Sequence, residues 1–121
     1  MATIERFEDI KAWQKARELA RTIYRLTAKA KFNKDFGLRE QIRKASISVM
    51  SNIAEGFARR GDKEFKRFLS IALGSTAEVQ SQLYAALDLE YITKKEFQDA
   101  YDAAMEVDKL ITGFMKYLNA D

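Results

Sequence analysis

The sequence predicts an all-α fold, an up-down-up-down antiparallel four-helix bundle. The chain has 121 residues, no proline and only five glycines, whereas strand-rich folds need frequent turn residues. Apolar residues recur at helical spacing in four long stretches, at about residues 10–30, 38–60, 63–90 and 94–118. Because short turns join them, consecutive helices should lie antiparallel, and residues 1–121 should form one domain.

The first stretch should begin after Asp9, whose carboxylate can cap the helix, and Phe7 can fold back on Trp13. Its outer face carries six cations, most simply a solvated surface: Lys11, Lys15, Arg17, Arg21, Arg25 and Lys29. Residues 31–36 should form a short polar turn, after which Gly37 opens the second helix.

The second stretch has more apolar surface than one core contact needs. Its core stripe is Leu38, Ile42, Ala45, Val49, Ile53 and Gly56. A second sector, formed by Ile47, Met50, Ala54 and Phe57, widens the apolar face to about half the circumference, beyond the usual ~100° stripe. We therefore predict that this sector contacts a second copy of the chain.

The third stretch should be capped by Asp62 and also has two faces. Its core face is Phe65, Phe68, Leu69, Ala72, Val79, Leu83, Ala86 and Leu87. The opposite face is a stripe of small residues, Ser70, Gly74, Ala77, Ser81 and Ala85. A glycine in mid-helix costs about 1 kcal/mol relative to alanine, which favours an oligomer interface over a merely solvent-facing stripe.

The fourth stretch begins with a capping box, Thr93 to Glu96, and has a regular core face that includes Phe97, Ala104 and Ile111. A row of carboxylates, Asp99, Asp102 and Glu106, lies on its outer face. Such a row could bind a cation but is more often simply solvated.

Polar side chains of the second and third stretches suggest a structural contact. Gln41, Asn52 and Glu55 follow one ridge of the second helix, and Glu78 lies on the facing helix. Two facing carboxylates could form an acid–base pair if burial separated their pKa values. The simpler interpretation is that these residues hold the helix junction together.

Composition excludes most catalytic chemistry. The chain has neither histidine nor cysteine, so catalytic triads, thiolates and His- or Cys-based metal sites are excluded. It also lacks Gly-rich phosphate loops and metal-ligand spacings. We predict no enzyme activity, no cofactor and no metal site. No apolar run approaches the ~18 residues of a membrane span, so we expect a cytoplasmic protein with no membrane contact.

Charge is unevenly distributed along the chain. Residues 1–67 contain seventeen basic and nine acidic residues, whereas residues 68–121 contain four basic and nine acidic ones. Seven cations around the second and third helices are the candidate nucleic-acid contacts: Arg43, Lys44, Arg59, Arg60, Lys63, Lys66 and Arg67. Clustered cations neutralise phosphates but specify no base sequence.

These residues also resemble a known family. The resemblance rests on Arg6-Phe7-Glu8-Asp9, Trp13, Gly37-Leu38, Gln41-Ile42-Arg43-Lys44-Ala45, Asn52-Ile53-Ala54-Glu55-Gly56, Phe65, Phe68-Leu69, Gly74-Ser75 and Glu78. Together they resemble the ribosomal-protein-like four-helix bundles encoded in intervening sequences of bacterial 23S rRNA genes. One departure is the first turn, where many relatives carry a proline and this chain has Phe32-Asn33.

The resemblance implies a ring-shaped homo-oligomer, a pentamer. Family members are similar to the accessory protein of diversity-generating retroelements, a pentameric barrel that contacts a reverse transcriptase and binds nucleic acid through a basic surface. We therefore expect a non-enzymatic homo-oligomer that binds RNA or DNA through phosphates. The alternative is a protein-interaction module that docks a partner such as a polymerase and uses its basic residues to pair subunits.

Overall fold

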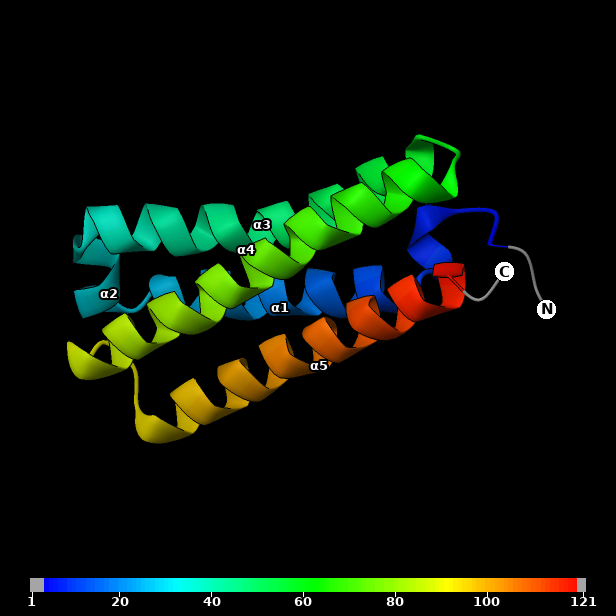
Figure 1. Ribbon diagram of the computed structural model, residues 1–121. Coiled ribbons are helices and arrows are strands. Elements are labelled where there is room, and N and C mark those ends of the chain that lie inside the picture. Colours follow the sequence, from blue (N-terminus) through cyan, green and yellow to red (C-terminus); the bar gives the residue numbers. More distant parts are fainter. Residues whose placement is uncertain (1–3, 120–121) are drawn as a thin grey trace.

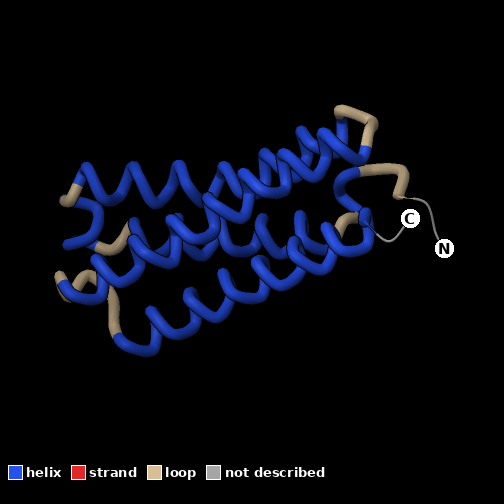
Figure 2. The backbone as a smooth tube through the Cα atoms, viewed as in Figure 1, coloured by secondary structure: helices blue, strands red, loops and turns tan. Residues whose placement is uncertain are grey.

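The computed structural model describes residues 4–119, which are almost entirely helical and contain no strand (Figure 2). In chain order the elements are the 3₁₀ turn η1 (Phe7–Asp9), α1 (Lys11–Thr27), α2 (Ala30–Lys34), α3 (Phe36–Ala58), α4 (Asp62–Asp88) and α5 (Lys94–Asn119). The predicted all-α class is confirmed. Within these residues, no helix is both long and apolar enough to span a membrane.

The four long helices α1, α3, α4 and α5 form an antiparallel bundle (Figure 1). Helix α3 packs against α1 and α4, and α5 packs against α4 and α1, so that each helix has two neighbours. The α3–α4 turn, residues 59–61, lies at one end with the N-terminal segment, and we call this the hairpin end (Figure 1). Helix α2 and the α4–α5 connection, residues 89–93, lie at the other, which we call the loop end.

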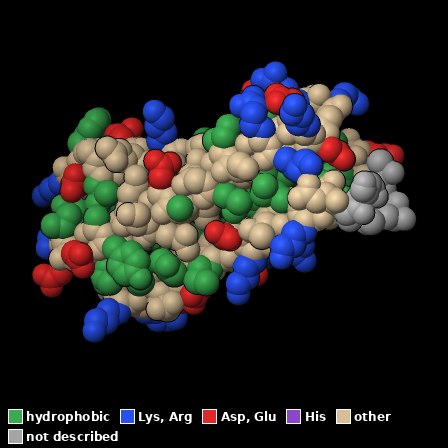
Figure 3. Space-filling model, in the orientation of Figure 1, with side chains coloured by type: hydrophobic (Ala, Val, Ile, Leu, Met, Phe, Trp, Pro, Cys, Tyr) green, Lys and Arg blue, Asp and Glu red, His purple; other side chains and the backbone are tan. Residues whose placement is uncertain are grey.

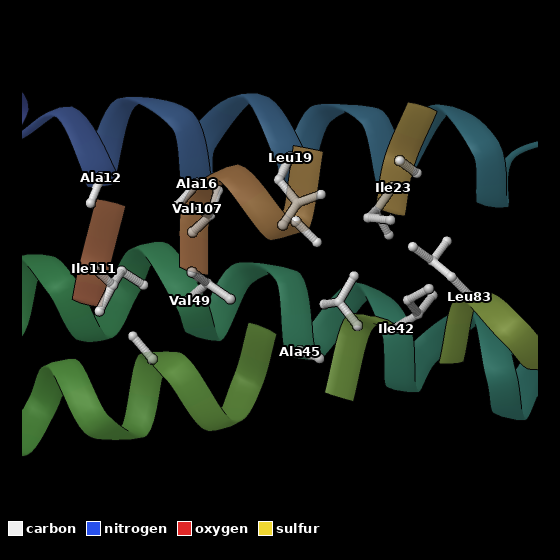
Figure 4. Close-up of a cluster of buried hydrophobic side chains, with 14 of the residues drawn as sticks. Ala12, Ala16, Leu19, Ile23, Ile42, Ala45, Val49, Leu83, Val107 and Ile111 are labelled. Atoms are coloured by element: carbon white, nitrogen blue, oxygen red, sulfur yellow. The ribbon is translucent and has the colours of Figure 1, made fainter. Parts of the chain in front are cut away.

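The core is built from the predicted apolar faces, and Figure 4 shows a part of it. Fully buried aliphatic side chains come from all four long helices: Leu19, Ile23, Ile42, Val49, Ile53, Leu69, Val79, Leu83, Val107 and Ile111. Alanines such as Ala16 and Ala104 lie among them and let neighbouring helices approach. The periodicity therefore identified the buried faces correctly.

The start of α1 differs from the prediction. Asp9 does not cap the helix, because Asp9 belongs to η1 and Ile10 occupies the capping position without a side-chain bond. Ile10 is 1% exposed, so burial of its side chain fixes this start. The predicted contact of Phe7 with Trp13 is confirmed, with ring centroids 5.0 Å apart in an edge-to-face arrangement.

The predicted polar turn at residues 31–36 is wrong. Helix α1 ends at Thr27, and Ala30–Lys34 forms a second short helix. The reason is Phe32, which is fully buried and packs against Tyr91 with ring centroids 5.3 Å apart. Helix α3 then begins at Phe36, one residue before Gly37, because the Asp35 carboxylate accepts a hydrogen bond from the Leu38 amide.

The capping of the last two helices was predicted with mixed success. Asp62 is the first residue of α4 and not its cap, since Gly61 takes the capping position. In the first turn, the negative charge of Asp62 interacts favourably with the positive end of the helix dipole. The capping box of α5 is confirmed. Thr93 Oγ1 accepts from the Glu96 amide at 3.1 Å, and Glu96 Oε1 accepts from the Thr93 amide at 2.9 Å.

Candidate nucleic-acid interface

Five of the predicted cations gather at the hairpin end. Helix α3 ends at Ala58 and α4 begins at Asp62, so the chain reverses within three residues. The cluster consists of Arg59, Arg60, Lys63, Lys66 and Arg67, which we call the hairpin cluster. Figure 3 shows lysine and arginine side chains gathered over this turn. Three acids, Glu55, Asp62 and Glu64, lie in the same segment, so cations are in excess.

Two arginines of the hairpin cluster are held in place by local contacts. Arg59 donates to Glu55 at 3.0 Å, and Arg67 donates to both oxygens of Glu64 at 3.1 and 3.2 Å. The hydrogen bonds from Arg67 lower the pKa of Glu64 below its usual value. Both guanidinium groups also lie over the Phe68 ring, 5.1 and 4.6 Å from its centroid. The two arginines are therefore pre-positioned side by side.

The other three cations differ in their surroundings. Within residues 4–119, the exposed Arg60 and Lys63 form no ion pair. Arg60 has a φ of 59°, a left-handed conformation in which non-glycine residues are strained. Lys66 donates to Asn119 Oδ1 at 2.7 Å, which ties α4 to the end of α5. Arg60 and Lys63 thus have the most freedom to meet an external anion.

Gly56 sets the spacing of the helices beneath the hairpin cluster. A Cβ atom at this position would lie 2.7 Å from Phe68 Cβ and 2.9 Å from Phe65 Cδ1. Contacts this short are not tolerated, so only glycine lets α3 and α4 approach this closely. The close approach brings Arg59 of α3 and Arg67 of α4 over the same ring.

Arg43 and Lys44 do not belong to the hairpin cluster. Arg43 Nε donates to Thr27 Oγ1 at 2.8 Å, and its guanidinium lies 4.6 Å from the Tyr24 ring centroid. It therefore joins α3 to α1. Lys44 is exposed and lines a groove between α3 and α4. Both lie roughly 22–24 Å from Arg59 along the helix axis, so they stand apart from the hairpin cluster.

The residues predicted to form an oligomer interface have different degrees of exposure. Met50 and Phe57 are half-buried and pack against the core, whereas Ile47 is 39% exposed. Ala54 is half-buried beside them. The small residues Ser70, Gly74, Ala77 and Ser81 are all exposed. A Cβ atom at Gly74 would meet no atom within 4 Å. Assembly through these residues stays a prediction.

The predicted polar residues separate into two groups. Asn52 donates to the Ser48 carbonyl at 2.8 Å and to its hydroxyl at 3.0 Å, and Ser48 bonds to Ser75 across the helix pair at 2.8 Å. This contact sets the register of α3 and α4. Along the helix axis, Glu55 and Glu78 lie on opposite sides of the Ser48–Ser75 contact, roughly 15 Å apart. They do not form an acid–base pair, so that alternative is wrong. Gln41 and Glu78 instead line the α3–α4 groove.

The carboxylates on the outer face of α5 each have a partner. Lys95 donates to Asp99 at 3.2 Å, and Gln98 donates to Asp102 at 2.8 Å. Lys15 of α1 lies 3.7 Å from Glu106. No group of three or more acids within residues 4–119 is arranged to hold a metal ion. These side chains hold the surface together locally.

The left-handed conformation of Arg60 was not foreseen from the sequence. The available signal is Arg60-Gly61 at the end of a helical pattern. Helices commonly place glycine in the left-handed position after their last turn. Here the glycine comes one residue later and is extended, with φ −165°, so the arginine takes the strained position.

Comparison with known proteins identifies the family. Residues 8–113 match the family described as 23S rRNA-intervening sequence protein. A crystal structure of a protein of unknown function from the S23 ribosomal protein family of Bacteroides thetaiotaomicron is similar, with a TM-score of 0.79 and 25% identity. The similarity covers 87% of this chain and 95% of that one. No curated protein matches. The chain therefore belongs to the family of 23S rRNA-intervening sequence proteins.

Proposed function

We propose that the protein is a non-enzymatic homo-oligomer that binds RNA or DNA mainly through phosphates at the hairpin end. The observation that carries this proposal is the hairpin cluster itself, in which five cations project from one turn against three acids. The two stacked arginines form a fixed pair of donors, and Arg60 and Lys63 add charge that no ion pair within residues 4–119 neutralises. Guanidinium groups match phosphate oxygens in geometry as well as charge.

The strain at Arg60 supports the same proposal. Glycine at this position would be more stable by roughly 1–2 kcal/mol, because L-residues are strained in the left-handed region. Folding alone therefore favours glycine where the chain has a cation. Such departures from local structural preference are typical of functional positions.

The family description makes RNA the first ligand to test. Its members are described as proteins of an intervening sequence in 23S rRNA, and the related crystal structure belongs to a ribosomal protein family. Neither description states what the proteins bind. The exposed small-residue stripe of α4 supports assembly of several copies, and the resemblance to pentameric relatives suggests five. A ring of hairpin clusters would increase the avidity for a long polyanion.

The test is filter binding of a structured RNA by the full chain over a range of salt concentrations. If all five cations contact phosphates, the logarithm of the binding constant should fall with a slope of about 4 against the logarithm of salt, or roughly 250-fold between about 50 and 200 mM. The double variant Arg60→Ala/Lys63→Ala should lower that slope by about 2. No retention of RNA at low salt would refute nucleic-acid binding.

Charge reversal distinguishes nucleic-acid binding from the alternative, a protein-interaction module that uses its basic residues to pair subunits. Arg59→Glu/Arg60→Glu should abolish RNA retention while light scattering shows an unchanged particle mass. If the particle instead dissociates, these cations pair subunits, and the interaction-module alternative is favoured. A wild-type protein that is monomeric at micromolar concentration would remove the oligomer from the proposal.

A further inference from the structure

A second polar feature lies on the same face of the α3–α4 pair, nearer the loop end. The two helices are closest at Gly56 and separate toward the loop end (Figure 1). A groove of about 310 Å³ opens between them, lined by Gln41, Lys44, Ala45, Ser48, Glu78 and Gln82. This volume is at the lower limit of small-ligand sites, so the groove suits a single ring system better than a large cofactor.

The two walls of the groove have complementary chemistry. Gln41 and Lys44, three residues apart on α3, offer an amide and an ammonium donor. On α4, Glu78 offers a carboxylate acceptor, and Gln82 lines the groove four residues further along. Within residues 4–119, none of these four side chains forms a hydrogen bond or ion pair. Lys44 and Glu78 thus face the same groove with opposite charges that do not pair.

Gln82, whose side chain lines the groove, carries a buried oxygen without a partner. Gln82 Oε1 is the one buried side-chain nitrogen or oxygen in residues 4–119 that has no hydrogen-bond partner. Leaving such a group unpaired destabilises a fold, and an apolar side chain of similar size would remove the penalty. This oxygen is closed to solvent, so the acceptors open to a ligand in the groove are the two carboxylate oxygens of Glu78, whose side chain is exposed.

We propose that the groove binds one unpaired guanine base of the nucleic acid, an inference that rests on the proposed function. Guanine offers N–H groups at N1 and N2 for the two carboxylate oxygens of Glu78, and acceptors at O6 and N7 for Lys44 and Gln41. Adenine, cytosine and uracil each have a single N–H-bearing group on the base edge, so each leaves one of the Glu78 oxygens unpaired. Unstacked bases are the usual targets of sequence-specific RNA recognition.

The groove and the hairpin cluster can contact one strand. Arg59 and Arg67 lie at one end of the α3–α4 face, Lys44 and Glu78 lie toward the other, and the Ser48–Ser75 contact lies between. Lys44 is fifteen residues from Arg59 on the same helix, or roughly 22 Å. A single strand of several nucleotides spans this length. Phosphate contacts at the hairpin cluster would supply most of the affinity, and the base in the groove would supply the preference for guanine over other bases.

The experiment compares short single-stranded oligouridine probes that carry one central guanine, adenine or hypoxanthine, by fluorescence anisotropy with the full chain at low salt. The guanine probe should bind about tenfold more tightly than the adenine probe, as expected for a bidentate base contact. Hypoxanthine lacks the N2 amino group, so its probe should fall between the two.

Groove variants test which residues give the preference. Glu78→Gln and Lys44→Met should each abolish it. Asp88→Asn and Lys11→Met remove the same charges at exposed positions outside the groove and should retain it. Gln82→Leu should keep the preference while its melting temperature stays the same or rises, because the unpaired carbonyl is removed. A purely structural glutamine would show a fall in melting temperature instead.

The outcomes separate this inference from the proposed function. Equal binding of all probes, unchanged in the groove variants, would overturn the guanine site and leave phosphate binding intact. If no probe binds, phosphate binding fails, and guanosine alone is then titrated while the side-chain amides of Gln41 and Gln82 are followed by NMR. Shifts specific to guanosine over adenosine support the site on its own, and their absence overturns it.

Discussion

At the loop end, polar side chains join segments that are far apart in the sequence, whereas at the hairpin end they mostly pair within one helical turn. Lys29 bonds to Glu96, 67 residues away, and Tyr91 donates to Asp35, 56 residues away, at 2.9 Å. The hairpin pairs Arg59–Glu55 and Arg67–Glu64 span four and three residues. Lys66 is an exception, because it reaches Asn119.

The loop-end contacts use helix caps as clamps. Glu96 caps α5 through the Thr93 amide and also accepts from Lys29 of the α1–α2 connection. Asp35 caps α3 through the Leu38 amide and also accepts from Tyr91 of the α4–α5 connection, which raises the pKa of Tyr91. Each carboxylate thus fixes a helix start and a neighbouring element together. The loop-end charges serve the fold, while the hairpin charges remain available to a ligand.

The largest expected effect is at Gly56, where the hairpin end depends on backbone spacing. Gly56→Ala should lower the free energy of unfolding by about 2–3 kcal/mol, because the added Cβ would clash with Phe68 Cβ and Phe65 and force the helices apart. Urea denaturation followed by circular dichroism measures this change.

Gly113→Ala, inside α5, is the matched control, since its added Cβ would meet no atom within 4 Å. It should stabilise the chain by about 1 kcal/mol through helix propensity alone. If both substitutions change the free energy of unfolding equally, the close approach of α3 and α4 at Gly56 does not stabilise the hairpin end.

The second prediction separates folding from binding at the hairpin end. Arg60→Gly should raise the free energy of unfolding by roughly 1–2 kcal/mol, because the left-handed conformation then costs little. The same variant should weaken RNA binding. Glu90, with a φ of 61°, occupies the equivalent position after α4 at the loop end. Glu90→Gly should give a similar stabilisation without weakening RNA binding; equal weakening by both would contradict a specific hairpin contact.

The sequence was sufficient to predict the bundle because helix periodicity is strong in all four long helices. Ile42, Val49 and Ile53 repeat at spacings of seven and four, and all three are fully buried. Helix α2 was missed for a physical reason. Its single buried anchor, Phe32, stands among polar residues, and only contact with the distant Tyr91 ring makes this turn helical. One apolar residue has no periodicity to detect.

The candidate site was predictable only in part. Counting charges located the hairpin cluster, because those cations all lie within residues 59–67. The same count gave no sign that Arg43 lies apart from that cluster, since helical spacing does not reveal that Arg43 contacts Thr27 and Tyr24 of α1. The unpaired carbonyl of Gln82 depends on the separation of α3 and α4, which no local pattern encodes.

The third prediction concerns the cap at the loop end. Thr93→Ala removes the hydroxyl that accepts from the Glu96 amide and should cost about 1 kcal/mol of unfolding free energy. Thr93→Ser keeps the acceptor and should stay close to the wild type. If alanine and serine behave alike in urea denaturation, the capping box does not contribute to the loop-end clamp.

The smallest effect is the acid dependence of that clamp. The Lys29 ammonium, together with the Thr93 amide, lowers the pKa of Glu96 in the folded chain. A carboxyl group with a lowered pKa stabilises the fold above its unfolded pKa of about 4.3, and this stabilisation is lost as the pH falls through the folded pKa. Lys29→Met should therefore cost about 0.5–1 kcal/mol near neutral pH, as expected for a partly exposed pair, and progressively less in acid.

Lys95→Met serves as the comparison for this titration, because Lys95 and Asp99 form a much more exposed pair, with side chains 85% and 64% accessible. Its effect should be near zero at every pH, since solvent screens the pair. Urea midpoints of each variant and of the wild type are measured from neutral to acidic pH. The midpoint of Lys29→Met should approach that of the wild type as the pH falls, whereas the midpoint of Lys95→Met should stay close to the wild type throughout. A Lys29→Met penalty that persists in acid would show that the lysine methylenes, rather than the bond to Glu96, connect α1 to α5.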